Sequence, residues 1–181
     1  MQLNQIAVQY SPEADRLLLR VRSTSGQLYE AWLTRRLVLR FWPHVRQAVE
    51  QLGAKAAAAR VAPGATVMPE AQPMLAQAAK ESVLREADFK TPFNTQTTSQ
   101  PLGKEPLLAT EVQLTTLPDG QLRLTLFDVQ RRSIALQLTD QMAIAVRELL
   151  EQGLGQAQWG LLTGEASGAR VMQAPGERVL N

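Results

Sequence analysis

The sequence predicts an α+β protein of two pseudo-symmetric strand-strand-strand-helix units, each an antiparallel meander with a helix on one face, joined by a crossover helix. Three observations predict this fold class. Apolar residues alternate with polar ones in two regions, each region changes to helical spacing directly after a threonine, and the two regions align at a constant offset of 105 residues. We therefore expect one compact domain with a first unit (1–53), a connection (54–107), a second unit (108–154) and a C-terminal tail (155–181).

Three strands are predicted in the first unit, because apolar residues recur at every second position between turn-forming segments. The inward-facing residues of these strands are Ile6, Val8 and Tyr10, then Leu17, Leu19 and Val21, then Tyr29, Ala31 and Leu33. Thr34 is the expected N-cap of the following helix, since its hydroxyl can accept from a free amide of the first turn. Gly53 is the expected end of that helix. Pro43 lies inside it and predicts a kink near residues 39–42 or two short helices in succession.

The second unit repeats this order of elements. Its inward-facing strand residues are Val112 and Leu114, then Leu122, Leu124 and Leu126, then Ile134, Leu136 and Leu138. Thr139 is the expected N-cap of its helix, and Gly153 is the expected end. The offset of 105 holds without a gap from residue 15 to about residue 45. This alignment predicts a structural duplication. Any two such units with common loop lengths would align in a similar way, so common ancestry does not follow.

The connection between the units is rich in Ala, Pro, Thr and Gln. Its first part, residues 54–69, has few bulky apolar side chains and contains Pro and Gly, which predicts an exposed loop. A helix is expected at about 73–88, where apolar residues favour one side. Phe89 and Phe93 are expected to anchor the connection onto the two units. The last twenty residues are expected to form a weakly ordered tail.

The composition limits the class of protein. Cysteine is absent, which excludes disulfides, thiolate nucleophiles and thiolate metal sites. The chain opens without a signal-peptide pattern and has no apolar run that could span a membrane, so we expect a cytoplasmic protein with no membrane partner. Residues 1–60 hold nine basic and four acidic residues, and eight of those nine are arginine. This excess indicates either an anionic partner or intramolecular pairing with the more acidic second half.

No arrangement of residues predicts catalysis. His44 is the single histidine, and without a cysteine or a GxSxG segment it has no nucleophile to activate. One imidazole and no thiolate cannot form a zinc site. Asp119, Asp128 and Asp140 lie in predicted turns or beside a cap, where bonds to the backbone explain them better than Mg²⁺ or Ca²⁺. The sequence therefore predicts no catalytic residue, no cofactor and no metal. An enzyme that uses carboxylates and a bound metal remains the alternative, because the number of acidic residues would allow it.

The most informative predicted surface is the face of the first sheet opposite its inward leucines. Strand alternation places cations, leucines and a tryptophan on this face, and the helix that follows extends the positive charge. The candidate interaction residues are Arg16, Leu18, Arg20, Arg22, Leu28, Trp32, Arg35, Arg36 and Arg40. We expect a non-catalytic binding or assembly protein that acts through a protein partner or self-association, with the apolar residues buried and the arginines at the rim.

Single-stranded nucleic acid is the alternative partner for this face. Such platforms stack aromatic rings on bases and place cations along phosphates. The first unit offers the cations but a single ring, Trp32, and the anionic Glu30 is its neighbour. Both hypotheses also leave open that the face is covered by another part of the chain.

Three short motifs occur in a fixed order: WLTRR at 32–36, WP at 42–43 and ADFKTPF at 87–93. In these landmarks the chain resembles a family of uncharacterised bacterial proteins, and the resemblance implies no activity, cofactor or site residue. The paired units are also similar in outline to the PUR-type and Whirly folds that bind single-stranded nucleic acid. Those folds have four strands per unit where the sequence predicts three, so this likeness implies a general architecture only.

Overall fold

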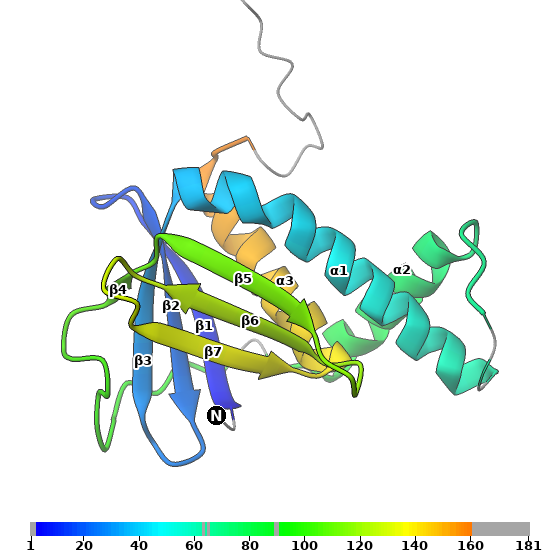
Figure 1. The fold of residues 1–181 in the computed structure, drawn as a ribbon, viewed down its shortest axis with the longest axis horizontal. Helices are drawn as coiled ribbons and strands as arrows, with labels where there is room; N and C mark the ends of the chain where they lie inside the picture. Colours follow the sequence, from blue (N-terminus) through cyan, green and yellow to red (C-terminus); the bar gives the residue numbers. More distant parts are fainter. Residues whose placement is uncertain (1–2, 63, 65, 89–90, 161–181) are drawn as a thin grey trace, which may run out of the picture.

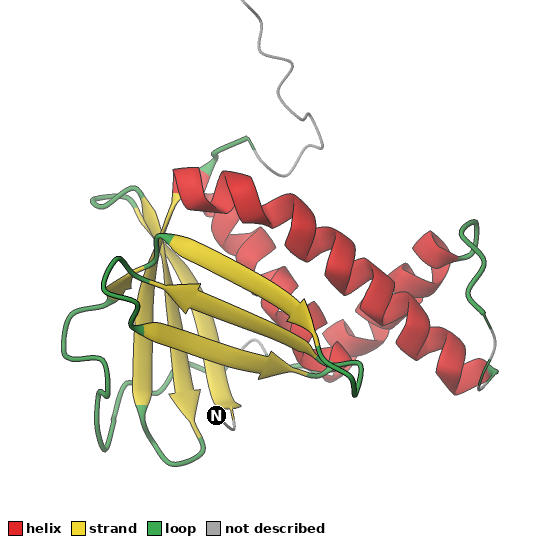
Figure 2. Cartoon of the chain, in the orientation of Figure 1, coloured by secondary structure: helices red, strands yellow, loops and turns green. Residues whose placement is uncertain are grey.

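A computed structural model describes residues 3–62, 64, 66–88 and 91–160 (Figure 1 and Figure 2). Over these residues the fold is α+β, with two sheets and three helices. The order along the chain is the predicted one: three strands and a helix, a connecting helix, then three strands and a helix. A short additional strand precedes the second set. No helix in this part of the chain is long and apolar enough to cross a membrane.

The first sheet has the strand order β1-β2-β3-β4. The strands are β1 (Leu3–Ser11), β2 (Arg16–Ser23), β3 (Leu28–Thr34) and β4 (Leu107–Leu108). β1, β2 and β3 pair antiparallel as predicted, whereas β4 pairs parallel to β3, with Trp32 opposite Leu108. The sequence did not indicate β4, because two apolar residues after a proline carry no strand periodicity. Tertiary pairing with β3 makes this segment a strand.

The second sheet has the strand order β5-β6-β7, and both pairings are antiparallel. The strands are β5 (Glu111–Thr116), β6 (Leu122–Phe127) and β7 (Ser133–Leu138). The predicted inward leucines of β6 and β7 are buried, while alternate residues are mostly exposed. The β5–β6 turn contains Gly120 at φ +82°, a conformation that favours glycine, and Asp119 Oδ1 accepts from the Gln121 amide at 3.0 Å.

Helix α1 (Arg35–Val61) begins as predicted and ends later than predicted. Thr34 Oγ1 accepts from the Leu37 amide at 3.2 Å. Gly53 does not end the helix, and residues 54–61 are helical instead of a loop, because alanine has the highest helix propensity. Pro43 lies inside α1 and does not divide it into two short helices. At Gly53 a Cβ atom would lie 3.4 Å from Ile144 Cδ1, so this glycine marks close helix packing.

Helix α2 (Gln72–Glu86) lies close to the predicted range, and helix α3 (Asp140–Ala157) also runs past its predicted end. The N-cap of α3 is Thr139, whose Oγ1 accepts from the Met142 amide at 3.3 Å. Gly153 is an internal, buried residue of α3, and the tail does not begin at residue 155, since Trp159 is buried. Phe89 and residues 161–181, which hold most of the predicted tail, lie outside the described residues.

Each unit's helix contacts the sheet of the other unit. Helix α3 follows the second sheet in sequence but packs mainly over β1, and less over β2, of the first sheet (Figure 1). Helix α1 contacts β5 of the second sheet, and α2 packs on α1. The inner faces of both sheets and all three helices thereby share one hydrophobic core, which includes Leu17, Val38, Leu124 and Leu154. Burying this core is the main stabilising contribution to the fold.

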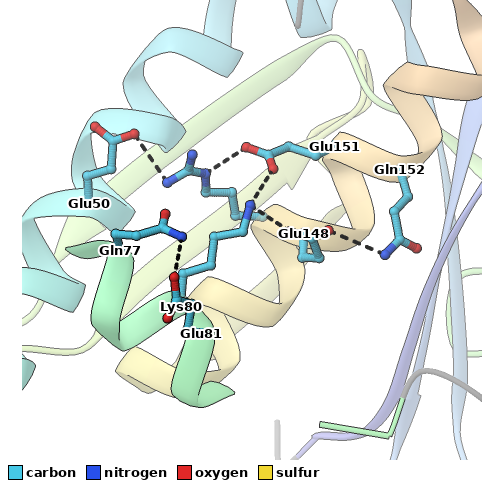
Figure 3. A network of polar contacts seen from close by, with 8 residues as sticks. Glu50, Gln77, Lys80, Glu81, Glu148, Glu151 and Gln152 are labelled. Carbon is cyan, nitrogen blue, oxygen red and sulfur yellow. Dashed lines mark hydrogen bonds and ion pairs between the residues drawn. The ribbon is translucent and has the colours of Figure 1, made fainter. Parts of the chain in front are cut away.

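A polar network fixes the three helices relative to one another (Figure 3). Lys80 of α2 lies 2.9 Å from Glu148 Oε2 and 3.0 Å from Glu151 Oε2 of α3. Arg147 of α3 bonds Glu151 at 2.9 Å and reaches Glu50 of α1 at 3.2 Å. Burial lowers the pKa of Lys80, but the hydrogen bonds to the two glutamates outweigh it and raise that pKa above 10.5.

Candidate interaction surface

The outer face of the first sheet, opposite α3, carries the strand residues of the predicted interaction surface. The strand register arranges this face in rows that cross the sheet. The rows are Gln5, Arg22 and Leu28; Ala7, Arg20 and Glu30; Gln9, Leu18, Trp32 and Leu108; and Ser11, Arg16 and Thr34. Alternation therefore brings the predicted strand residues onto one face, as expected.

An apolar row crosses the middle of this face. Leu18, Trp32 and Leu108, called the apolar row below, occupy facing positions on β2, β3 and β4. Leu18 and Trp32 are half-buried, and Leu108 is 41% exposed. Leu108 was not among the predicted surface residues, because the sequence placed it at the start of the second unit (108–154) and indicated no strand at residues 107–108. The two residues that form β4 differ sharply in exposure, since Leu107 is fully buried and Leu108 is partly exposed. Only the pairing with β3 shows that these two residues alternate between the two faces of the sheet.

Arg20 is held within the chain. Its guanidinium lies 5.0 Å from the centroid of the Phe93 ring, and its Nη2 donates to Gln9 Oε1 at 3.1 Å. Cation–π contacts of this kind stabilise by about 0.5–1 kcal/mol at exposed sites. Phe93 therefore anchors the connection onto the first unit, as predicted. Arg20 consequently has less freedom to contact a partner than the other arginines of this face.

The connection also covers the lower end of the outer face. Leu28 is buried, and its backbone amide donates to the Ser99 carbonyl at 3.0 Å. The Asn94 amide donates to Gln5 Oε1 at 3.0 Å. Leu28 therefore belongs to the interior of the chain in this structure. The part of the candidate surface that the connection leaves open is the apolar row and the arginines on the Arg16 side of it.

The remaining predicted cations form no ion pair within the described part of the chain. Arg16 and Arg22 are half-buried on β2, whereas Arg35, Arg36 and Arg40 are exposed at the start of α1. The first turn of α1 contains no acidic residue, so two arginines add to the positive end of the helix dipole. Of the cations in residues 1–60, Arg60 alone pairs with a described acidic residue, Asp140, at 3.1 Å. The charge of this surface is therefore available to an anionic partner.

Asp15 is an acidic side chain close enough to Arg35 for their charges to interact. Its Oδ1 accepts from Trp159 Nε1 at 2.8 Å and from the Tyr10 hydroxyl at 2.9 Å. These two hydrogen bonds, with the charge of Arg35, lower the pKa of Asp15 below its ordinary value. Asp15 is therefore ionised at neutral pH and joins the β1–β2 turn to the residues that follow α3. Its backbone φ of +46° is one that aspartate and asparagine tolerate better than most residues.

A groove of about 860 Å³ lies beside β1, on the other side of the strand from β2. Its walls are apolar residues of α3, among them Met142, Ala145 and Leu149, and the segment that follows α2. The sequence did not indicate this groove. Its walls come from three segments far apart in the chain, so no local sequence pattern predicts that these segments pack together.

The structure gathers no catalytic arrangement around the residues considered from sequence. His44 is exposed on α1 and lines a hollow of about 470 Å³ with Arg40 and Glu111. Asp128 is buried and accepts from the Gln130 and Arg132 amides, each at 2.9 Å. Burial raises its pKa, but hydrogen bonds from Arg132 prevail and lower it, so Asp128 has a local structural role. Within the described ranges, no three Asp, Glu or His side chains could hold a metal ion.

Comparison with known proteins adds no relative. No protein-family model matches the chain, and neither a curated protein nor a solved structure is significantly similar to it.

Proposed function

We propose that the chain is a non-catalytic, cytoplasmic binding protein that recognises another protein through the outer face of its first sheet. The observation that carries the proposal is the apolar row, with Leu108 41% exposed, on a face that also holds arginines without ion-pair partners. Protein interfaces typically have an apolar centre and a polar rim, and Trp and Arg are their most frequent energetically dominant residues.

The charges of the surface specify the partner further. Arg16 lies one row from Trp32, and Arg35, Arg36 and Arg40 continue at the start of α1. A complementary partner surface has an apolar centre that covers Trp32 and an acidic rim that meets these arginines. Such charge complementarity raises the association rate and excludes basic partners.

Photo-crosslinking in the cells that naturally produce the protein tests the proposal. A photoreactive phenylalanine derivative is placed at Leu108, and the control carries the same group at Ala135, which is exposed on β7 of the second sheet. We expect an adduct with one defined protein at position 108, no such adduct at position 135, and loss of the adduct when Trp32→Ala is added. Thermal melting shows whether each variant is folded.

The mass of the adduct distinguishes the possible partners. An adduct of two copies of the chain means self-association through this face, and a nuclease-sensitive adduct means nucleic acid. No adduct at position 108, or equal adducts at both positions, contradicts the proposed site.

Single-stranded nucleic acid is the second candidate partner, favoured by the unpaired arginines. The engagement of Arg20 with Phe93 and the presence of leucines on both sides of Trp32 count against it. Fluorescence anisotropy with labelled single strands at two salt concentrations decides the matter, because binding to phosphates weakens steeply with salt. Under the proposed function we expect no binding at physiological salt.

A further inference from the structure

Strand β1 has a free edge. Its hydrogen-bonding partner is β2, and in the described part of the chain no strand pairs with its other side. Alternate backbone amides and carbonyls of an edge strand point away from the sheet and can pair with another chain. Monomeric proteins protect such edges with charged residues, prolines, bulges or covering segments. β1 contains no charged residue and no proline, and its one irregularity lies between Leu3 and Gln5, so Gln5–Ser11 is a regular edge with which no described strand pairs.

The groove beside β1 offers contacts for the side chains of an added strand. On the inner side, α3 presents Met142, Ala145 and Leu149, which are all half-buried. On the outer side, Pro92 and Phe93 form the opposite wall. Side chains of an added strand would alternate between these two walls, because successive residues of a strand point to opposite faces.

Few of the described residues that line the groove are charged. The charged residues among them are Arg20 and Asp88. Arg20 contacts Gln9 and Phe93 while its Nε has no hydrogen-bond partner in the described part of the chain, and Asp88 accepts from the Thr91 amide at 3.0 Å. The other lining residues are apolar or are uncharged polar residues such as Asn4, Gln152 and Gln156. Away from Arg20 and Asp88, a charged side chain would lose hydration without meeting a described ion-pair partner, so the groove favours a largely uncharged segment.

A second copy of the chain does not fit this edge. Antiparallel strands lie about 4.8 Å apart, and a two-fold axis between two β1 strands would place both α3 helices on the same side of the joined sheet. Helix α3 lies mainly over β1, so the two helix axes would approach to about one strand spacing. Packed helices need about 8–10 Å between their axes. A single extended segment carries no such helix and enters the groove without this clash.

We propose that β1 and its groove bind an extended, uncharged peptide segment of a partner protein, which adds to the first sheet as a strand beside β1. The segment carries small or medium-sized apolar side chains at every second position, directed toward Ala145 and Leu149, and uncharged polar side chains between them. Backbone hydrogen bonds along Gln5–Ser11 provide affinity, and the α3 wall provides side-chain specificity. This site is separate from the apolar row and does not depend on the proposed function of that row.

A peptide selection tests the proposal with the full chain. A display library of random dodecapeptides is selected against the protein, and selected peptides are synthesised and measured by fluorescence anisotropy. We expect uncharged sequences in which apolar residues recur at every second position. The substitution Ala145→Phe fills the groove and should weaken binding about tenfold or more, whereas Ala78→Phe, the same change at an exposed position of α2, should change it less than about twofold.

Amide hydrogen exchange locates the bound peptide and provides a readout that misfolding would not imitate. Alternate amides of Gln5–Ser11, which face away from β2, should become protected in the complex, while their neighbours keep the protection that β2 already gives them. Three results would overturn the proposal: failure to select any peptide, binding that Ala145→Phe leaves unchanged, or a protein that dimerises through β1. A thermal melt of Ala145→Phe near that of the wild type establishes that lost binding reflects a filled groove.

Discussion

Two buried glycines, both expected from sequence to end helices, give a sharp test of the packing. Glycine inside a helix costs about 0.5–1 kcal/mol relative to alanine. In Gly53→Ala the new Cβ would lie 3.4 Å from Ile144 Cδ1 and 3.5 Å from Ala79 Cβ, which is ordinary contact. The free energy of unfolding should therefore rise by about 0.5–1 kcal/mol.

In Gly153→Ala the same gain in helix propensity meets a steric cost. The new Cβ would lie 3.0 Å from Val8 Cγ1 and 3.1 Å from Leu17 Cδ2, and Leu17 is fully buried in a close-packed core with little room to shift. Overpacking of a core costs about 1–3 kcal/mol, so we expect a net destabilisation between about zero and 2.5 kcal/mol. Because the propensity contribution cancels, the two variants should differ by about 1–3 kcal/mol.

Urea unfolding followed by circular dichroism measures both variants against the wild type. In thermal melts the same difference corresponds to about 2–4 °C per kcal/mol for a chain of this size. A Gly153→Ala variant as stable as Gly53→Ala would refute the reasoning, because it would show that α3 does not approach β1 and β2 as closely as the structure indicates.

Three further predictions concern local interactions. Asp15→Asn should lower the free energy of unfolding at neutral pH and change the fluorescence of Trp159. Because the folded pKa of Asp15 is lowered, its stabilising contribution is lost as pH falls through that pKa. The free energies of unfolding of the variant and the wild type should therefore converge in acid. Lys80→Met should lower the free energy of unfolding, measured in urea at neutral pH, by about 1–2 kcal/mol. Because the folded pKa of Lys80 is raised above 10.5, this difference in stability should persist to that pH and shrink as pH rises through the folded pKa. Thr34→Ala should lower the free energy of unfolding by about 1 kcal/mol, and an unchanged value would mean that the cap bond to Leu37 contributes nothing.

The alternation of apolar residues and the two threonine caps were enough to predict the α+β class, the order of elements and the faces of the strands. These features are local, because a strand face or a helix cap depends on residues within a few positions of one another. The same reasoning placed Leu18, Arg20 and Trp32 on one face. It gave wrong helix ends at Gly53 and Gly153, since it read each glycine as a stop when both are internal contacts.

The sequence by itself determined the three strands and the helix of each unit, the connecting helix, and the apolar face of each strand, apart from the ends of the helices. The tertiary structure alone decided that α3 covers the first sheet, that β4 adds Leu108 beside Trp32, and that a groove lies along β1. Each of these features depends on contacts between segments far apart in the chain. Their geometry follows from the packing of one shared core, and the periodicity within a single segment does not predict that packing.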